Sequence, residues 1–586
     1  MRLRAVASFL SLALISLSLQ AGISPVKSPN DANDYRYLVL DNQLRTLLIS
    51  DPSADKAAAS LNITVGSGDD PADREGLSHF LEHMLFLGTE KYPDPGEYQQ
   101  FIRSHGGTHN AFTAFQDTNY FFDIQPDYLE QALDRFAQQF SAPLFTPELV
   151  ERERRAVHSE FTSQMREDSR RNYSARQQAM NPAHPASQFS VGNMHTLEDS
   201  AERPLQPDVV AHWHARYSAN IMTLVVYGPQ SLDELEAMVR PRFSAIENRN
   251  LAPLAHDLAL FEPEPLPRLL EIQTLREVHQ LNLSFPIPSQ RPYYRDKPLY
   301  YLASILGDEG PGSLLDVMKQ MGWVESLSAG QGLEAGQQTS FEISLALTPQ
   351  GFANWQAVTA MIFKQIDSLR QEGIDEVRFA EKQQLAELDF RFAEKLPPVR
   401  TATRLSMLLH HVDPENVLRA PWMLENYRPD AYRALLEKLT PDNVLVTLAG
   451  PRALPDDAPQ TRWYSTPHQL SALSPNQLTG TLPADLASQL ALPAANPFVP
   501  ENLELVTGDA MNRPMQLNAP GNLTLWYARD TRFGTPRANI YLSLRSPVST
   551  ASPKEHVLNQ LLVDSINVNL NPIAYAASLT GLEYRV

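Results

Sequence analysis

Hydrophobic and polar positions along the chain follow two periods, and the clearest change from one to the other lies near the N-terminus. Residues 61–65 (Leu-Asn-Ile-Thr-Val) alternate between apolar and polar side chains, as a strand does. A polar, glycine-containing turn follows, and apolar residues then recur at helical spacing over residues 77–85. Gly88 is suitable as a C-cap. The pattern therefore predicts a strand, a turn and a helix that is apolar on most of its surface.

This predicted helix carries His79, Glu82 and His83 in the order H-x-x-E-H, the reverse of the zinc-protease motif H-E-x-x-H. The two histidines are four residues apart, so both imidazoles leave the same face and can share one metal ion. Glu82 lies beside that ion, where a carboxylate can take a proton from a water molecule that the metal has acidified. The alternative is an amphipathic helix with two core histidines. A buried helix, however, needs partners for two histidines and a glutamate.

Zinc in a catalytic site needs a third protein ligand, and a second predicted helix offers candidates. Residues 146–148 (Thr-Pro-Glu) form a strong helix start, and no breaker interrupts the run from Leu149 to about Arg170. Glu153 and Glu160 are two turns apart on one face of this helix, so one could bind the metal while the other orients a histidine. The spacing alone leaves open which residue has which role. It also leaves open that both are surface acids of a charged helix.

The first strand pattern recurs later in the chain. Residues 61–65 have a counterpart in 281–285 (Leu-Asn-Leu-Ser-Phe), and Asn220 to Pro229 has one in Asn443 to Pro451, both at a spacing of about 220 residues. Two markers with one period predict two homologous α/β units, at about residues 35–260 and 265–480. We expect an α+β fold of repeated α/β-sandwich units, in which helices cover an antiparallel-rich sheet. The second unit lacks H-x-x-E-H and should bind no metal, forming a wall for substrate.

A third unit is predicted to begin near the C-terminus. Residues 481–519 are rich in Pro, Ala and Asn and are typical of a connector. Residues 538–542 (Ala-Asn-Ile-Tyr-Leu) again resemble the first strand, which places the start of a third unit in 520–586. Far fewer residues remain after this strand than either complete unit contains. We therefore expect the third unit to be truncated.

The net charge and the cysteine count exclude some partners and some chemistries. The net charge is −19 and no basic cluster is present, which argues against nucleic acid as a partner. The chain has no cysteine, so disulfides, thiolate ligands and a cysteine nucleophile are excluded and a metal is left to histidine and carboxylate. A chain without thiols also suits an oxidising compartment such as the periplasm.

The first 21 residues are predicted to be a signal peptide. Arg2 and Arg4 form a charged start, residues 5–19 form an apolar segment too short to span a membrane, and small residues allow cleavage after Ala21. We expect a periplasmic protein with no membrane contact after cleavage. The alternative is a retained membrane anchor.

Further motifs accompany H-x-x-E-H, and together they resemble a known family. They are Gly76-Leu77-Ser78, Phe86-Leu87-Gly88-Thr89, Asn110-Ala111-Phe112-Thr113, Gly307 to Leu315, and Asn496-Pro497-Phe498-Val499-Pro500. From about residue 35 to its last residue, the chain resembles the inverzincin zinc metalloproteases of the insulinase (pitrilysin) family M16. The resemblance is greatest to the long bacterial periplasmic members. Asp308 departs from the pattern because many relatives have histidine there, a change that bears on substrate contact and leaves the metal site untouched.

The resemblance implies a metal site and an activity. One Zn²⁺ per chain would be bound by His79, His83 and Glu160, with Glu82 as the general base and Glu153 in contact with a ligand. The implied activity is that of an endopeptidase for peptides and small polypeptides, in which two halves close like a clamshell. The C-terminal half of such a clamshell would be missing here. The rival hypothesis is therefore a chain that binds zinc and peptides but hydrolyses them weakly or not at all.

The resemblance also implies where a peptide substrate would lie. The segment 108–122 would offer an edge strand to which an extended peptide adds, with Asn110 and Ala111 near the scissile bond. Leu327, Ala329 and Gln331 follow Trp323, where relatives anchor the N-terminus of a peptide. Each of these two predicted contacts has a simpler alternative. Asn110 could be a turn residue after two glycines, and residues 327–331 could be part of an ordinary hairpin.

Overall fold

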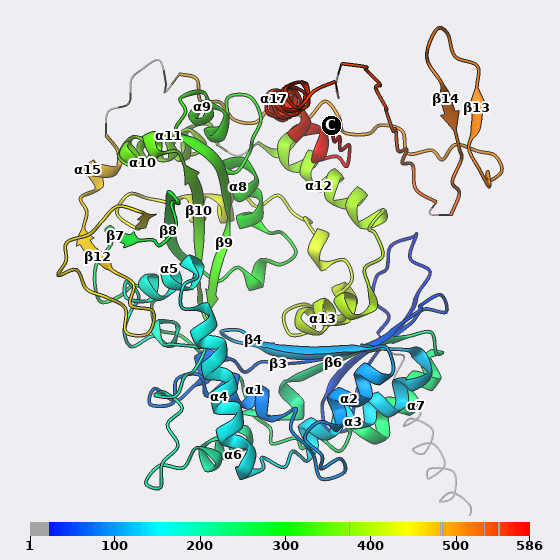
Figure 1. Cartoon of the computed structure of the whole chain (residues 1–586), viewed down its shortest axis with the longest axis vertical. Helices are drawn as coiled ribbons and strands as arrows, with labels where there is room; N and C mark the ends of the chain where they lie inside the picture. The colour runs from blue at the N-terminus through cyan, green and yellow to red at the C-terminus, as the bar shows by residue number, and fades with distance from the viewer. Residues whose placement is uncertain are drawn as a thin grey trace, which may run out of the picture.

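The computed structural model describes residues 23–373, 375–480, 482, 486, 488–532, 534–548 and 551–586. The predicted signal peptide, residues 1–21, lies outside these residues. Two six-stranded sheets form the body of the chain, each covered by helices, and a C-terminal extension leaves the second of them (Figure 1). The predicted α+β class with repeated units is confirmed.

The first sheet has the strand order β1-β2-β6-β3-β5-β4, so β1 and β4 are its edges. All neighbouring strands are antiparallel except β2 and β6, which are parallel. Its strands are β1 (Asp34–Val39), β2 (Arg45–Ser50), β3 (Ala57–Ile63), β4 (Thr108–Thr113), β5 (Thr118–Ile124) and β6 (Met222–Gly228).

The second sheet repeats this arrangement with the order β12-β7-β11-β8-β10-β9, and β7 and β11 are its parallel pair. Asn62 on β3 lies opposite Thr223 on β6, and Asn282 on β8 lies opposite Thr447 on β11. The register therefore confirms the repeat that the sequence predicts. The strands are β7 (Arg268–Gln273), β8 (Gln280–Pro288), β9 (Val324–Ala335), β10 (Gln338–Leu347), β11 (Leu445–Gly450) and β12 (His468–Ala472).

Helices between the strands pack with the sheets to form the two apolar cores. Those that follow strands of the first sheet are α1 (Leu77–Met84), α2 (Glu97–Ser104), α3 (Leu129–Ser141), α4 (Pro147–Gln164), α5 (Asp168–Gln177), α6 (Leu205–Arg216) and α7 (Leu232–Phe243). Those of the second unit are α8 (Pro298–Leu306), α9 (Leu314–Gln320), α10 (Pro349–Ala353), α11 (Trp355–Glu372), α12 (Glu376–Arg391), α13 (Pro398–Leu408), α14 (Pro429–Leu436) and α15 (Pro475–Leu478).

The two units exchange one helix each, which the sequence did not indicate. Helix α13 lies across β3 and β6 of the first sheet (Figure 1), where Leu405 packs in a core with Leu47 and Val225. Helix α5 packs in turn on the second sheet, where Ala175 meets Leu270. The predicted helix from Leu149 to about Arg170 is therefore wrong at its end. Although no residue there breaks a helix, the chain turns after Gln164 so that α5 can cross to the other sheet.

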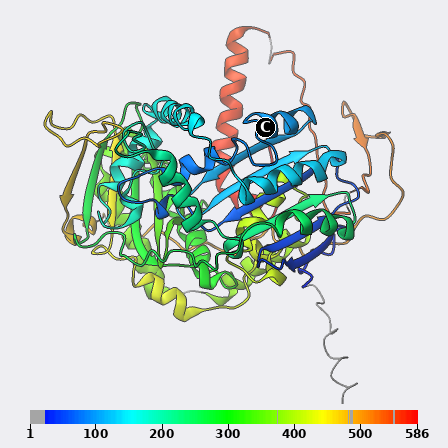
Figure 2. The ribbon, with the colours of Figure 1, turned by 90° about the horizontal axis from the view of Figure 1, so that it is seen from below.

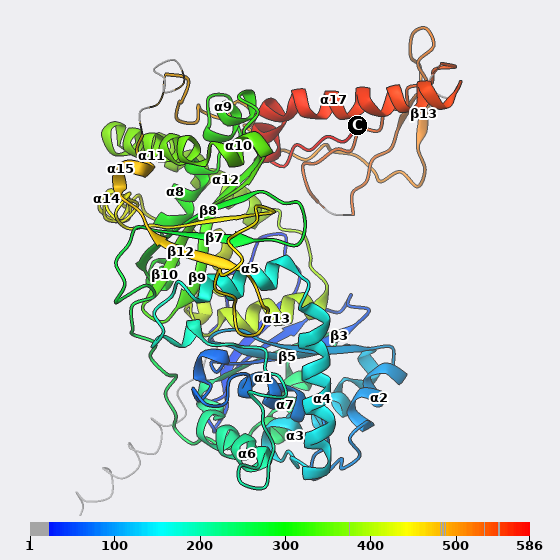
Figure 3. The ribbon, with the colours of Figure 1, turned by 60° about the vertical axis from the view of Figure 1, so that its left-hand side comes forward.

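The C-terminal extension contains a short hairpin, β13 (Met515–Leu517) with β14 (Leu525–Tyr527), and the helix α17 (Pro553–Ser578). Helix α17 stands out from the body in two directions of view (Figures 2 and 3). The strand expected at 538–542 is not formed, because the described chain brings no strand alongside it, and Tyr541 is 90% exposed. No helix in the described part of the chain is long and apolar enough to cross a membrane.

Candidate metal centre

Helix α1 begins at a backbone turn that only glycine fits. Gly76 has φ +87°, and a Cβ there would lie 2.3 Å from the backbone of Gly192. The buried carboxylate of Asp70 accepts hydrogen bonds from the backbone N–H of Gly76 (2.8 Å) and Ser78 (2.7 Å). A distant side chain thus caps the helix start, where free N–H groups need an acceptor. Burial raises the pKa of Asp70 to about 7.

Helix α6 fixes the same turn from the other side. The Ser78 hydroxyl donates to the Gly66 carbonyl at 2.9 Å and lies 3.0 Å from Nε2 of His212 on α6. His212 is buried, and burial lowers its pKa to about 4, so it is the neutral ring that donates its Nε2 proton to Ser78. The side chain of the residue before His79 is therefore held by two hydrogen bonds, in addition to the bond from its backbone N–H to Asp70.

Three predicted ligands converge between α1 and α4. Nε2 of His79 and Nε2 of His83 each lie 3.7 Å from Oε2 of Glu160, and the two imidazole rings meet edge to face at 4.9 Å. These three residues form a group of donor atoms close enough to hold one ion. Tetrahedral zinc bonds of about 2.0–2.2 Å place neighbouring ligand atoms roughly 3.4 Å apart, so the arrangement fits zinc.

Hydrogen bonds at the other ring nitrogens orient both histidines. Nδ1 of His79 donates to the Val191 carbonyl at 2.6 Å, and Nδ1 of His83 lies 3.4 Å from Oε2 of Glu153. Each bond keeps a proton on Nδ1, so Nε2 is the nitrogen that faces Glu160 and is available to a metal ion. Glu153 thus contacts a candidate ligand and Glu160 belongs to the donor group, the division of roles that the resemblance implies.

The carboxylates govern protonation at the centre. Burial alone would lower the pKa of His83, but its contacts with Glu153 and Glu160 outweigh burial and raise the pKa to about 9. Contact with His83 lowers the pKa of Glu160 against the effect of burial. A metal ion entering this site therefore displaces a proton from a histidine.

Glu82 is buried, with 7% of its surface exposed, and faces the edge strand β4. The Thr113 hydroxyl on β4 donates to Oε2 of Glu82 at 2.6 Å. Burial raises the pKa of Glu82, although His79 and the Thr113 bond act in the opposite direction. A carboxylate whose pKa is raised toward neutrality is a more effective base than an exposed one.

Segment 108–122, in which an edge strand is expected, forms β4 and most of β5. Strand β4 is the edge of the first sheet, and β5 lies inside it. Asn110 is exposed and Ala111 half-buried, and they lie in the strand opposite Phe121 and Tyr120. Asn110 is thus a strand residue and not the turn residue of the plainer interpretation. Because β4 leads to Thr113, a peptide added to this edge would run past Glu82.

The second predicted contact segment lies on β9, the edge of the second sheet and one strand of the β9–β10 hairpin. Leu327 is buried in the core of the second unit, so its side chain packs inward and only its backbone is available for contact. Ala329 is half-buried, and Gln331 is exposed and donates to Oε2 of Glu334 at 2.6 Å. Asp308 is buried and accepts from the Gly310 backbone at 2.8 Å.

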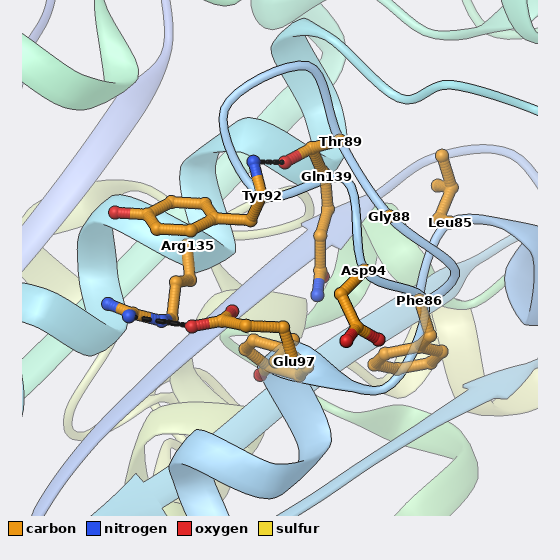
Figure 4. Close-up of a pocket in the computed structure, with 10 residues that line it drawn as sticks. Leu85, Phe86, Gly88, Thr89, Tyr92, Asp94, Glu97, Arg135 and Gln139 are labelled. Atoms are coloured by element: carbon orange, nitrogen blue, oxygen red, sulfur yellow. Dashed lines mark hydrogen bonds and ion pairs between the residues drawn. The ribbon is translucent and has the colours of Figure 1, made fainter.

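A small pocket lies between α2, α3 and the loop that follows α1 (Figure 4). Gln139 points into it, and Arg135 pairs with Glu97 at its side with an Nη2–Oε1 distance of 2.7 Å. Its volume is about 10 Å³, which is room for about one water molecule. The pocket is therefore far too small for a peptide.

Asp70, Thr113 and Val191 act on the site and were missed as site residues by sequence reasoning. Val191 acts through its backbone carbonyl, so its residue type carries no signal of the role. Asp70 acts through its carboxylate, but it lies outside the predicted helix and its contacts are with backbone N–H groups, which no motif marks. Thr113 belongs to the quoted motif Asn110 to Thr113, and its position two residues beyond Ala111 was the one available clue.

The chain is similar to known proteins along nearly its whole length. Three family descriptions match it: "Insulinase (Peptidase family M16)" over 45–188, "Peptidase M16 inactive domain" over 204–385, and "Middle or third domain of peptidase_M16" over 390–586. The inactive-domain match begins at α6 of the first unit and ends within α12 of the second, after the H-x-x-E-H motif.

Individual relatives agree with the family match. The human insulin-degrading enzyme is 37% identical over 95% of this chain, and the A-factor-processing enzyme of Saccharomyces cerevisiae is 33% identical over 95%. The crystal structure of pitrilysin superposes with a TM-score of 0.83 at 29% identity, over 96% of this chain and 60% of that one. The chain spans 55% of the length of each of the two enzymes. Fold, motif and relatives together establish that the chain belongs to the insulinase family of peptidases, family M16.

Proposed function

We propose that the chain is a zinc-dependent endopeptidase that hydrolyses peptides and small polypeptides, with one zinc ion per chain. The observation that carries this proposal is the convergence of His79, His83 and Glu160 beside the buried carboxylate of Glu82. A zinc ion held there would supply a Lewis acid that polarises the scissile carbonyl and acidifies water.

Glu82, Thr113 and Glu153 have separate roles in the proposed reaction. Glu82 takes the proton of the attacking water and returns it to the leaving amine, as a base with a raised pKa can. Thr113 donates to one carboxylate oxygen of Glu82 and leaves the other free for the proton. Glu153 keeps His83 turned toward Glu160.

Strand β4 is proposed to bind the substrate backbone. An extended peptide adds to the free edge of β4 through backbone hydrogen bonds, near Asn110 and Ala111. The β9 edge in the second unit is proposed as a more distant contact, through the backbone of Leu327 and the exposed positions around Ala329 and Gln331. Backbone pairing makes few demands on the substrate's side chains, which suits peptides of varied sequence.

A second candidate function is supported by the C-terminal extension. Apolar side chains along α17 are exposed, among them Leu558 (52%), Leu562 (57%) and Val568 (72%), as is Leu544 (97%) before it. Exposed apolar stripes of this kind mark surfaces that a further polypeptide covers. If such a C-terminal half is needed to position the substrate, this chain alone binds zinc and peptide and hydrolyses slowly or not at all.

Hydrolysis of a quenched fluorogenic peptide by the zinc-loaded chain tests the proposal. Glu82→Gln should retain zinc and lose about 10²- to 10⁴-fold in rate, because the water then has no base. Glu148→Gln, an exposed position at the start of α4, is the control and should match the wild type. Hydrolysis that survives in Glu82→Gln would refute the role of Glu82. Zinc binding without hydrolysis in the wild type would favour the second candidate.

We also propose that the chain works in the periplasm. The composition of residues 1–21 and the absence of cysteine support this location. N-terminal sequencing of the protein from the periplasmic fraction should begin at Gly22, and recovery of Met1 on membrane-bound protein would contradict it.

A further inference from the structure

The internal repeat gives the second unit a cleft that corresponds to the metal centre. In the first unit the ligands come from α1, which follows β3, and from α4. In the second unit α8 follows β8, and α12 is the long helix that precedes α13, as α4 precedes α5. A cavity of about 300 Å³ lies between α8 and α12. We call it the second cleft.

Residues that line the second cleft occupy the positions of the metal-site residues. Lys382 and Asp389 lie as far from the start of α12 as Glu153 and Glu160 lie from the start of α4. Tyr300 is the third residue of α8, as His79 is the third residue of α1. All three line the cavity. The helix positions match in the two units, whereas the side chains at those positions differ.

The floor of the second cleft is one face of α12. Lys382, Leu385, Ala386 and Asp389 are spaced by three and four residues, so they lie in one row along the helix. The row has a cation at one end, two apolar side chains in the middle and a carboxylate at the other end. Trp422 and the end of α17, with Ser578, Leu579 and Gly581, complete the walls.

The two charges of the row make no direct contact with an opposite charge among the described residues. The side chains of Lys382 and Asp389 form no hydrogen bond or ion pair there, although Asp308 and Glu381 act on Lys382 and Arg537 acts on Asp389 through space. Burial lowers the pKa of Lys382, although the carboxylates of Asp308 and Glu381 act in the opposite direction, and burial raises the pKa of Asp389 against the effect of Arg537. A neighbouring amine, that of Lys297, already donates to the Ala420 carbonyl at 2.6 Å and the Pro421 carbonyl at 2.5 Å.

A ligand that fits must carry two opposite charges. Seven residues of helix separate Lys382 from Asp389 by roughly 10 Å. An extended chain of three residues has its amino and carboxylate ends about the same distance apart. Metal is disfavoured because Lys382 puts a positive charge where the first unit has Glu153.

We propose that the second cleft binds a short zwitterionic peptide, with its carboxylate at Lys382, its amino group at Asp389 and an apolar side chain over Leu385 and Ala386. The ligand class is that of the products of peptide hydrolysis. The site contains none of the metal-centre residues, so binding does not depend on the hydrolysis proposed above. Because residues 578–581 form part of the wall, an occupied cleft also holds the end of α17 against the second unit.

Calorimetric titration of the full chain with the tripeptide Ala-Leu-Ala tests the proposal. We expect saturable binding that weakens at least about tenfold when the peptide is amidated at its C-terminus or acetylated at its N-terminus. Lys382→Met should remove the preference for the free carboxylate, and Asp389→Asn the preference for the free amine. Glu387→Gln, exposed on the same helix, and Lys364→Met, exposed on α11, are the matched controls and should bind as the wild type does.

Three outcomes would overturn the proposal. One is the absence of binding at millimolar peptide, and another is equal binding of the free and blocked peptides. The third is loss of binding in His83→Ala, which would place the peptide at the metal centre. Circular dichroism melting of each variant separates loss of binding from loss of fold. Binding that persists while Glu82→Gln abolishes hydrolysis would show that the two sites are separate.

Discussion

The two units of this chain share a sheet order, a parallel strand pair and a pair of helices whose side chains face one another, yet only one helix pair carries the side chains of a metal site. In the first unit two histidines of α1 face two glutamates of α4. In the second, Tyr300, Lys382 and Asp389 stand at matching positions. The difference teaches that the scaffold fixes where a ligand can sit, whereas a few side chains decide which ligand it is.

The largest effect, on zinc affinity, should come from placing a lysine at Glu153, the position that matches Lys382 of the second unit. Glu153→Lys places a positive charge beside His83 and removes the carboxylate that orients it. We expect zinc affinity to fall at least about a thousandfold, since charge repulsion adds to the loss of an orienting contact. Competition with a fluorescent chelator measures this change. Glu148→Lys, with the same change of charge at an exposed position of α4, should bind zinc normally.

The exchange of helices between the units can be tested through stability. Leu405 of α13 is fully buried on the first sheet, so Leu405→Ala should cost about 3 kcal/mol in the free energy of unfolding. Urea unfolding followed by circular dichroism gives this value. Arg400→Ala, exposed on the same helix, should change stability by less than about 0.5 kcal/mol. Equal effects of the two variants would mean that α13 is not seated on the first sheet in solution.

A smaller, pH-dependent loss of folding stability should arise from His212 in the first unit. Burial holds the pKa of His212 at about 4 in the folded protein, against an ordinary value of 6.5. Between pH 6.5 and pH 4, His212 is protonated in the unfolded chain but stays neutral in the folded protein. The free energy of unfolding therefore decreases as pH falls from 6.5 toward 4. His212→Gln should remove roughly 2 to 3 kcal/mol of this loss.

Unfolding of the metal-free wild type and of His212→Gln at pH 7 and pH 4.5 measures the difference. The variant should be the less stable protein at pH 7, because Ser78 loses a hydrogen-bond partner, and the gap should shrink in acid. Parallel curves for the two proteins would contradict a neutral, buried His212.

Local patterns in the sequence predicted the first strand, the helix α1 and the repeat, because each depends on side chains within a few residues or on similarity between two segments. The pairing of His79 and His83 followed from helical spacing alone. The assignment of Glu160 to the metal and Glu153 to His83 did not follow from spacing, since both lie on one face of α4, and it came from the family resemblance.

Features that depend on distant contacts were not predicted. The exchange of α5 and α13 leaves no periodic signal, because a buried helix face looks the same whichever sheet it meets. The strand expected at 538–542 has the right residues but no neighbouring strand in the described chain. The second cleft was missed because Lys382 and Asp389 match no metal motif. The available signal was their position. Lys382 and Asp389 lie as many residues from the start of α12 as Glu153 and Glu160 lie from the start of α4.

One scaffold occurs twice in this chain, and we expect only the metal centre of the first unit to bind zinc. Elemental analysis after dialysis should compare the zinc stoichiometry of three proteins, the wild type, His83→Ala and Lys382→Met. We expect one zinc per chain in the wild type, none in His83→Ala and one in Lys382→Met. Two zinc ions in the wild type, or a full complement in His83→Ala, would contradict it.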